Sequence, residues 1–167
     1  ENCPVWQTHD PENEEVTFRT LGPLKAACER VVEESLPGRA LNIRVGLMAG
    51  PFDATGRFTY WPRRIAEGGE VLVPGEPDLP IQIIDARDLA NWIVRQAEAR
   101  RSGTYNATGP DYPLTIRQLV EACRDATGSD ATFTYVDEQF LIDAGVKGFG
   151  LWIPHAPGIG GVNCGKA

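Results

Sequence analysis

The 167-residue sequence contains no apolar run long enough to cross a membrane, and no basic segment followed by an apolar one of the kind that directs secretion. Basic residues are also few: 16 Lys and Arg stand against 23 Asp and Glu, for a net charge of −7. The basic pairs Arg63–Arg64 and Arg100–Arg101 have acidic neighbours and are typical of solvated helix faces. Because nucleic-acid binding requires clustered positive charge, we expect neither a nucleic-acid nor a membrane partner.

The four cysteines form no C-x-x-C pair, so a redox motif is not indicated. Cys28 and Cys123 fall on apolar faces of expected helices, where a free cysteine behaves as a small hydrophobic residue. These features favour a reduced, cytoplasmic setting. One metal alternative stays open, a zinc site without recognisable ligand spacing, built from Cys3, His9, His155 and Cys164.

The spacing of apolar residues alternates between helix and strand periods along most of the chain. Helices are expected over 23–36, 58–66, 85–99, 115–126 and 137–144, and strands over 40–45, 71–73, 81–84, 104–107 and 132–136. Thr115 with Gln118 predicts a capping box, and Asp137 a second helix cap. Such alternation indicates an α/β fold with a largely parallel sheet.

Four segments in register resemble the extended short-chain dehydrogenases/reductases, the NAD-dependent epimerase/dehydratase family. Residues 21–29 (LGPLKAACE) are similar to its Y-G-x-x-K-x-x-x-E segment, and residues 44–51 (RVGLMAGP) to its R-P-x-x-x-x-G-P turn. Residues 82–90 (QIIDARDLA) look like F-I-D-V-R-D-L-A, and residues 103–109 (GTYNATG) like G-x-Y-N-x-T-G. The resemblance covers roughly residues 2–145.

The resemblance implies the C-terminal portion of a Rossmann-like, doubly wound parallel sheet plus a small substrate-binding α/β subdomain. Residues 1–57 would be the remnant of the Rossmann-like domain. Residues 58–167 would be mainly the substrate-binding region, with 81–107 returning to the sheet.

In the family, the Tyr of Tyr-x-x-x-Lys exchanges a proton with a substrate hydroxyl or carbonyl, and the Lys binds the nicotinamide ribose. Lys25 occupies the Lys position, but Leu21 occupies the Tyr position and has no proton to exchange. Loss of a general acid–base costs about 10²–10⁴-fold in rate. By the same resemblance, Gly46 and Leu47 would pass beside the nicotinamide, although Gly46 is equally readable as a turn glycine.

The family's glycine-rich phosphate-binding turn does not occur in the sequence. The tail from Gly160 nearly matches the phosphate loop G-x-x-x-x-G-K-[ST], but Ala167 lacks the hydroxyl that binds magnesium. We therefore expect NAD or NADP in the intact family protein, and none bound by this chain alone. On these residues we expect the chain to be inactive by itself; a degenerate, non-catalytic binding module and a truncated family member remain alternatives.

The expected substrate is a small, sugar-like molecule whose carbinol carbon exchanges hydride with the nicotinamide. Aromatic and polar side chains after the 40–45 strand are the candidates for binding it: Phe52, Tyr60, Trp61, Arg64 and Gln82. Ile81 stands where many nucleotide-sugar enzymes have an Arg, which weakens a nucleotide-sugar assignment. Helix packing is an equally good interpretation of the two ring residues at 60 and 61. A homodimer is kept open, and no metal is expected.

Overall fold

The computed structural model describes residues 15–17, 20–152 and 164, which fall into two compact units. The first unit runs to Ile43 and includes Arg95–Tyr105, and the second comprises Arg44–Val94 and the residues from Asn106 onward. Each unit is described by itself. The domain division expected at residues 57 and 58 stays a prediction.

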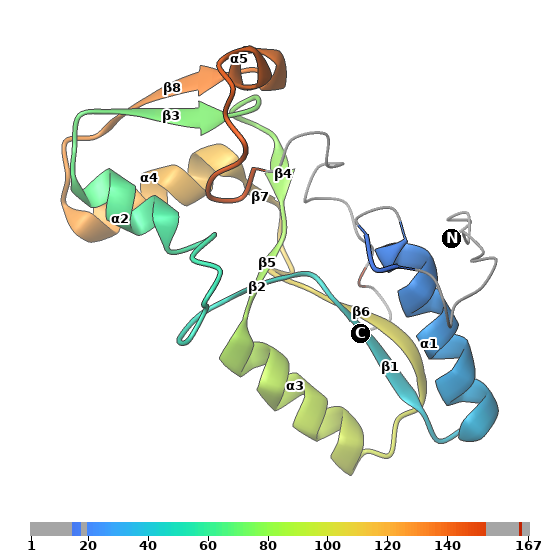
Figure 1. Cartoon of the computed structure of the whole chain (residues 1–167). Helices are drawn as coiled ribbons and strands as arrows, with labels where there is room; N and C mark the ends of the chain where they lie inside the picture. Colours follow the sequence, from blue (N-terminus) through green and yellow to red (C-terminus); the bar gives the residue numbers. More distant parts are fainter. Residues whose placement is uncertain (1–14, 18–19, 153–163, 165–167) are drawn as a thin grey trace. The chain divides into compact units, whose positions relative to one another are not determined.

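The first unit contains α1 (Leu21–Ser35) and most of the paired strands β1 (Leu41–Val45) and β6 (Gly103–Ala107) (Figure 1). Pro23 in the first turn of α1 costs no hydrogen bond, because its missing N–H would have no partner within the helix. Glu33 Oε1 accepts from Asn42 Nδ2 at 3.3 Å and from Thr104 Oγ1 at 3.2 Å, so the helix is tied to both strands. Cys28 is exposed, and its expected packing is therefore wrong.

In the second unit, β2 (Leu47–Ala49) pairs in parallel with β5 (Ile83–Asp85), with Leu47 opposite Ile83. The chain passes directly from β5 into α3 (Ala86–Glu98). Asp85 makes this transition sharp, because its Oδ1 accepts the Arg87 backbone N–H at 2.7 Å. This strand-to-helix junction forms part of the pocket described below.

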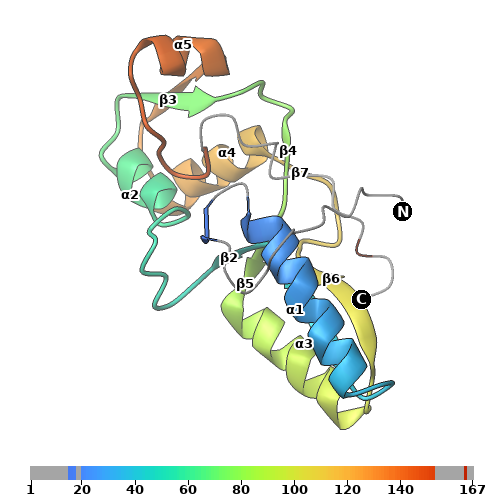
Figure 2. The same ribbon diagram turned by 45° about the vertical axis from the view of Figure 1, so that its right-hand side comes forward.

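A second parallel pair joins β3 (Glu70–Pro74) to β8 (Thr132–Val136). Figures 1 and 2 show α2 (Tyr60–Ala66) and α4 (Ile116–Thr127) side by side below this pair, and α5 (Glu138–Asp143) follows β8. The core lies between these helices and strands, and its most deeply buried side chains are Trp61, Ile65, Val71, Val73 and Val120. Cys123 is buried with them, as expected.

The strand expected over 81–84 is divided, because its two ends have different partners. β4 (Pro80–Ile81) pairs antiparallel with β7 (Leu114–Thr115), whereas β5 pairs with β2. Neither β2 nor β7 was expected. Both expected caps are confirmed: Thr115 and Gln118 form the capping box of α4, and Asp137 accepts from Phe140 N at 2.7 Å.

The architecture is thus α/β with parallel strand pairs, as the sequence predicts. Among the described residues, none of the helices combines the length and apolar character needed to span a bilayer.

Candidate functional site

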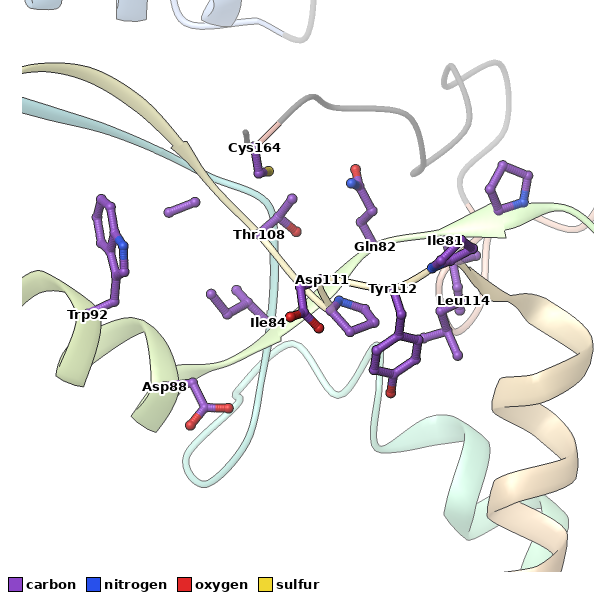
Figure 3. Close-up of a pocket in the computed structure, with 14 residues that line it drawn as sticks. Ile81, Gln82, Ile84, Asp88, Trp92, Thr108, Asp111, Tyr112, Leu114 and Cys164 are labelled. Atoms are coloured by element: carbon purple, nitrogen blue, oxygen red, sulfur yellow. The ribbon is translucent and has the colours of Figure 1, made fainter. Parts of the chain in front are cut away.

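A pocket of about 690 Å³ opens on the second unit, a volume suited to a small organic ligand. Three segments line it: residues 80–84, the first turns of α3, and the loop from Ala107 to Leu114; Cys164 completes the wall. Figure 3 shows Asp88 and Trp92 on α3 at one edge, and Tyr112 with Leu114 toward the opposite edge. The pocket therefore joins elements that are well separated in the sequence.

Two parts of the pocket lie beyond the carboxyl ends of strands, because α3 follows β5 and the 107–114 loop follows β6; residues 80–82, before β5, complete the lining. Ligands of open α/β sheets commonly bind beyond the carboxyl ends of strands. The loop is held by backbone hydrogen bonds from Ile83 N to Gly109 O (2.7 Å) and from Gly46 N to Ala107 O (3.1 Å). The backbone beneath the pocket is therefore fixed by two neighbouring segments.

Gly46 is packed directly against Thr108, which lines the pocket. A Cβ atom at Gly46 would overlap the Thr108 Oγ1 atom and would lie 2.6 Å from the Thr108 Cβ atom. Glycine is thus required here by space. The Thr108 hydroxyl oxygen is buried and has no hydrogen-bond partner in the described part of the chain.

The charged side chains of the pocket are acidic. Asp88 and Asp111 line it, and no Lys or Arg is among its described lining residues. Arg87 is close by, but its guanidinium binds Asp85, with Nη2 and Oδ2 2.7 Å apart. The side-chain hydrogen bond from Arg87, followed by its backbone N–H, lowers the pKa of Asp85 to about 2.

Of the residues predicted from the family pattern, Leu21 and Lys25 lie on α1, in the first unit. They are four positions apart and therefore share a face of the helix. The Lys25 side chain is exposed, and that of Leu21 is 40% exposed.

The aromatic candidates after β2 have different surroundings. Phe52 is fully exposed on a loop and has a φ of 68°, whereas Trp61 is 0% exposed in the core. Tyr60 is half-buried, makes an edge contact with Phe149 at 5.3 Å between ring centroids, and has a pKa raised by burial. None of the three lines the pocket.

Arg64 ties the end of α2 to the start of β3. Its Nη1 donates to Gly68 O at 3.0 Å and its Nη2 to Glu70 O at 2.6 Å. Gln82 is the one substrate-binding candidate that lines the pocket, and Figure 3 shows its side chain on the same side as Cys164. Leu47 lies in β2, partly buried against the core.

Sequence reasoning missed most of this pocket, notably Trp92, Thr108, Asp111 and Tyr112. Asp88, which also lines the pocket, lies in the first turn of α3, where a negative charge is favoured by the helix dipole. One available signal was the segment TGPDYP at 108–113, in which polar and aromatic residues follow a strand directly. Another was the four-residue spacing of Asp88 and Trp92, which places both on one helix face.

Of the four residues of the zinc alternative, only Cys164 lies within the described residues. Among those residues, no cluster of three or more His, Cys, Asp or Glu side chains is placed to hold a metal ion. The other three residues, Cys3, His9 and His155, lie outside the described residues.

Comparison of the fold with solved structures gives several reductases and epimerases. The dTDP-4-dehydrorhamnose reductase of Clostridium acetobutylicum matches 77% of this chain with a TM-score of 0.59 and 18% identity. The reductase of the same name from Bacillus anthracis, in complex with NADP, matches 81% with a TM-score of 0.58 and 20% identity. The UDP-N-acetylglucosamine 4-epimerase of Bacillus cereus matches 81% with a TM-score of 0.56 and 18% identity.

These similarities establish a shared Rossmann-like α/β fold. The chain spans 44–49% of the length of these three enzymes. No protein-family model matches the sequence, and no curated protein matches it.

Proposed function

We propose that this chain is the ribose-contacting and substrate-binding portion of an NAD(P)-dependent epimerase, dehydratase or reductase. The intact enzyme would move hydride between the nicotinamide and a carbinol carbon of a small, sugar-like substrate. The phosphates of the dinucleotide would be bound by a glycine-rich turn outside these 167 residues.

The observation that carries the proposal is the combination of fold and motif order. The neighbours, reductases and an epimerase, share the fold over about four fifths of the chain. Within that fold, α1 presents Lys25 on an exposed face and is followed by β1, and Gly46 comes directly after β1. An ammonium group on an exposed helix face is suited to donating hydrogen bonds to ribose hydroxyls.

Leu21 limits what the chain can do in this role. Its side chain lies one helical turn before Lys25, where the family has the phenol that exchanges the proton. An aliphatic side chain cannot act as a general acid or base, so turnover would be lower by about 10²–10⁴-fold. For this reason a non-catalytic module that binds ligand without turning it over is the second candidate.

Cofactor binding tests the assignment of Lys25. By calorimetry, we expect no measurable NAD(H) binding to these 167 residues alone, and a micromolar Kd (about −8 kcal/mol) would contradict this. In a longer protein that joins them to a glycine-rich strand–turn–helix, Lys25→Met should weaken NAD(P)H binding. The matched change Lys147→Met, at an exposed residue outside α1, should not. Equal effects of the two changes would refute the role of Lys25.

Turnover separates the two candidate functions. In the same longer protein, Leu21→Tyr should raise the rate of hydride transfer. The gain should approach the factor of about 10²–10⁴ that a general acid–base supplies. Leu21→Phe is the control, because it adds a ring of similar size without the hydroxyl. If both variants are as slow as the parent while NAD(P)H still binds, the non-catalytic module is the better description.

A further inference from the structure

The pocket beyond β5 and β6 combines apolar walls with acidic edges. Ile84 and Leu114 contribute apolar surface, and Trp92 and Tyr112 contribute rings. Tyr112 is 61% exposed, so its ring is accessible from solvent. A ligand that fills this pocket would need an apolar or aromatic body to replace the water on these surfaces.

Charge selects among such ligands. Two carboxylates, Asp88 and Asp111, line the pocket, and its described lining includes no basic side chain. The guanidinium of the neighbouring Arg87 is bound bidentately by Asp85 (2.9 Å from Nε to Oδ1 and 2.7 Å from Nη2 to Oδ2), and only the weakest of its charge interactions is with Asp88. The net charge of −7 adds a field that attracts cations and repels anions.

Phosphorylated ligands fit this pocket poorly. Phosphate groups are normally bound by Arg, Lys or a row of backbone N–H groups, and two carboxylates would repel them. Ile81, which also lines the pocket, is apolar and 4% exposed, and it offers no positive charge to a phosphate. This makes the pocket unlike a nucleotide-diphosphate site.

We propose that this pocket binds a small organic amine with an aromatic or apolar body. The ammonium group would lie against Asp88 and Asp111, and the body would lie on Ile84 between the Trp92 and Tyr112 edges. Asp88 and Trp92 are one turn apart on α3, so a carboxylate and a ring that attracts cations border the same space. The inference depends on the pocket alone and would stand if the proposed hydride chemistry failed.

Three ligands with one phenol ring and different charges test this: tyramine (cation), tyrosol (neutral) and 4-hydroxyphenylacetate (anion). Binding is followed by the indole N–H signals of the ¹⁵N-labelled chain, with Trp92→Phe identifying the Trp92 signal. Tyramine should shift that signal with a Kd near or below about 1 mM. It should bind about three- to tenfold more tightly than tyrosol, as two solvent-exposed carboxylates allow, and 4-hydroxyphenylacetate should bind more weakly still.

Removing the carboxylates completes the test. Asp88→Asn with Asp111→Asn should abolish the preference of tyramine over tyrosol, whereas Asp125→Asn, which removes one carboxylate outside the pocket, should preserve it. Asp88 lies in the first turn of α3, so Asp111→Asn alone provides a variant that leaves the helix unchanged. If the two carboxylates contribute equally, this variant should halve the free-energy difference between tyramine and tyrosol binding, to about half its value on a logarithmic scale.

Four outcomes would overturn the proposal. The first is that tyramine at about 10 mM does not shift the Trp92 signal, and the second is that all three ligands bind equally. The third is that 4-hydroxyphenylacetate binds more tightly than tyramine, and the fourth is that inorganic pyrophosphate displaces tyramine. None of these measurements involves NAD(P) or Lys25, so failure here and failure of the proposed function are distinguishable.

Discussion

Replacing Gly46 by Ala tests the close contact beneath the pocket. The added methyl group would overlap the Thr108 hydroxyl and lie 2.6 Å from the Thr108 Cβ atom. Thr108 cannot easily withdraw, because the residues on both sides of it accept backbone hydrogen bonds, at Ala107 O (3.1 Å) and Gly109 O (2.7 Å). Overpacking of this kind destabilises a folded protein by about 1–3 kcal/mol. We expect Gly46→Ala to fall within that range.

A double-mutant cycle locates the cause of this loss. Thr108→Gly removes both atoms that the new methyl group would meet, so the cost of Gly46→Ala in that background should drop below about 0.5 kcal/mol. The resulting coupling energy, about 0.5–3 kcal/mol, matches the range measured for residues in direct contact. Thr108→Val is informative as well: it keeps the shape and removes a buried hydroxyl without a partner, so stability should be unchanged or higher.

Urea unfolding followed by tryptophan fluorescence suits this measurement, because Trp61 is fully buried in the same unit as Gly46. Gly22→Ala is the control, since no atom lies within 4 Å of the position a Cβ would take and Gly22 lies in α1. At Gly22 the change to Ala should stabilise the helix by up to about 1 kcal/mol, which circular dichroism would measure. A loss of less than about 0.5 kcal/mol for Gly46→Ala, or an equal loss with and without the Thr108 side chain, would contradict the close contact.

Three further predictions concern residues away from this contact. Thr115→Ala removes the side-chain acceptor of the α4 capping box and should lower the free energy of unfolding by about 1 kcal/mol, measured in urea; no change would show that Gln118 alone suffices. The pKa of Asp85 is lowered from 3.8 to about 2 in the folded state, so its contribution to stability is present above pH 3.8 and is lost as the pH falls to about 2. In an acid titration, the stability of Asp85→Asn should therefore fall less steeply between pH 3.8 and about 2 than that of the parent. Burial raises the pKa of the Cys123 thiol, so iodoacetamide should label Cys123 more slowly than exposed Cys28 at about pH 8, as read by mass spectrometry of the peptides, and equal rates would contradict the burial.

Local chemistry accounts for the elements that the sequence predicts well. The capping box at Thr115 and the left-handed glycine that ends α4, Gly128 with a φ of 64°, are signals contained within a few residues. Their outcome depends little on the rest of the chain. The same holds for the cap at Asp137, whose acceptor and donor are three residues apart.

Strand pairing was less predictable, because it depends on partners far away in the sequence. Residues 81–84 form one apolar run, yet β4 within it pairs with β7 and β5 with β2. β2 and β7 contain only three and two residues, too short for a periodic pattern to be recognised. Cys28 shows the complementary error: its helical spacing indicates an apolar face, but nothing in the spacing says whether another element covers that face.

The pocket shows why a family pattern and a physical site can point to different residues. The motif resemblance directs attention to conserved positions of the family pattern, and among the substrate-binding candidates it supplied, only Gln82 lines the pocket. Asp88 is part of the family segment at 82–90, but Asp111, Trp92 and Tyr112, which supply the second charge and the rings, lie outside the quoted motif segments. Ligand preference is carried by such positions, because the fold constrains them least. The fold of this chain and the ligand it binds are therefore separate questions, and the amine titration addresses the second without assuming the first.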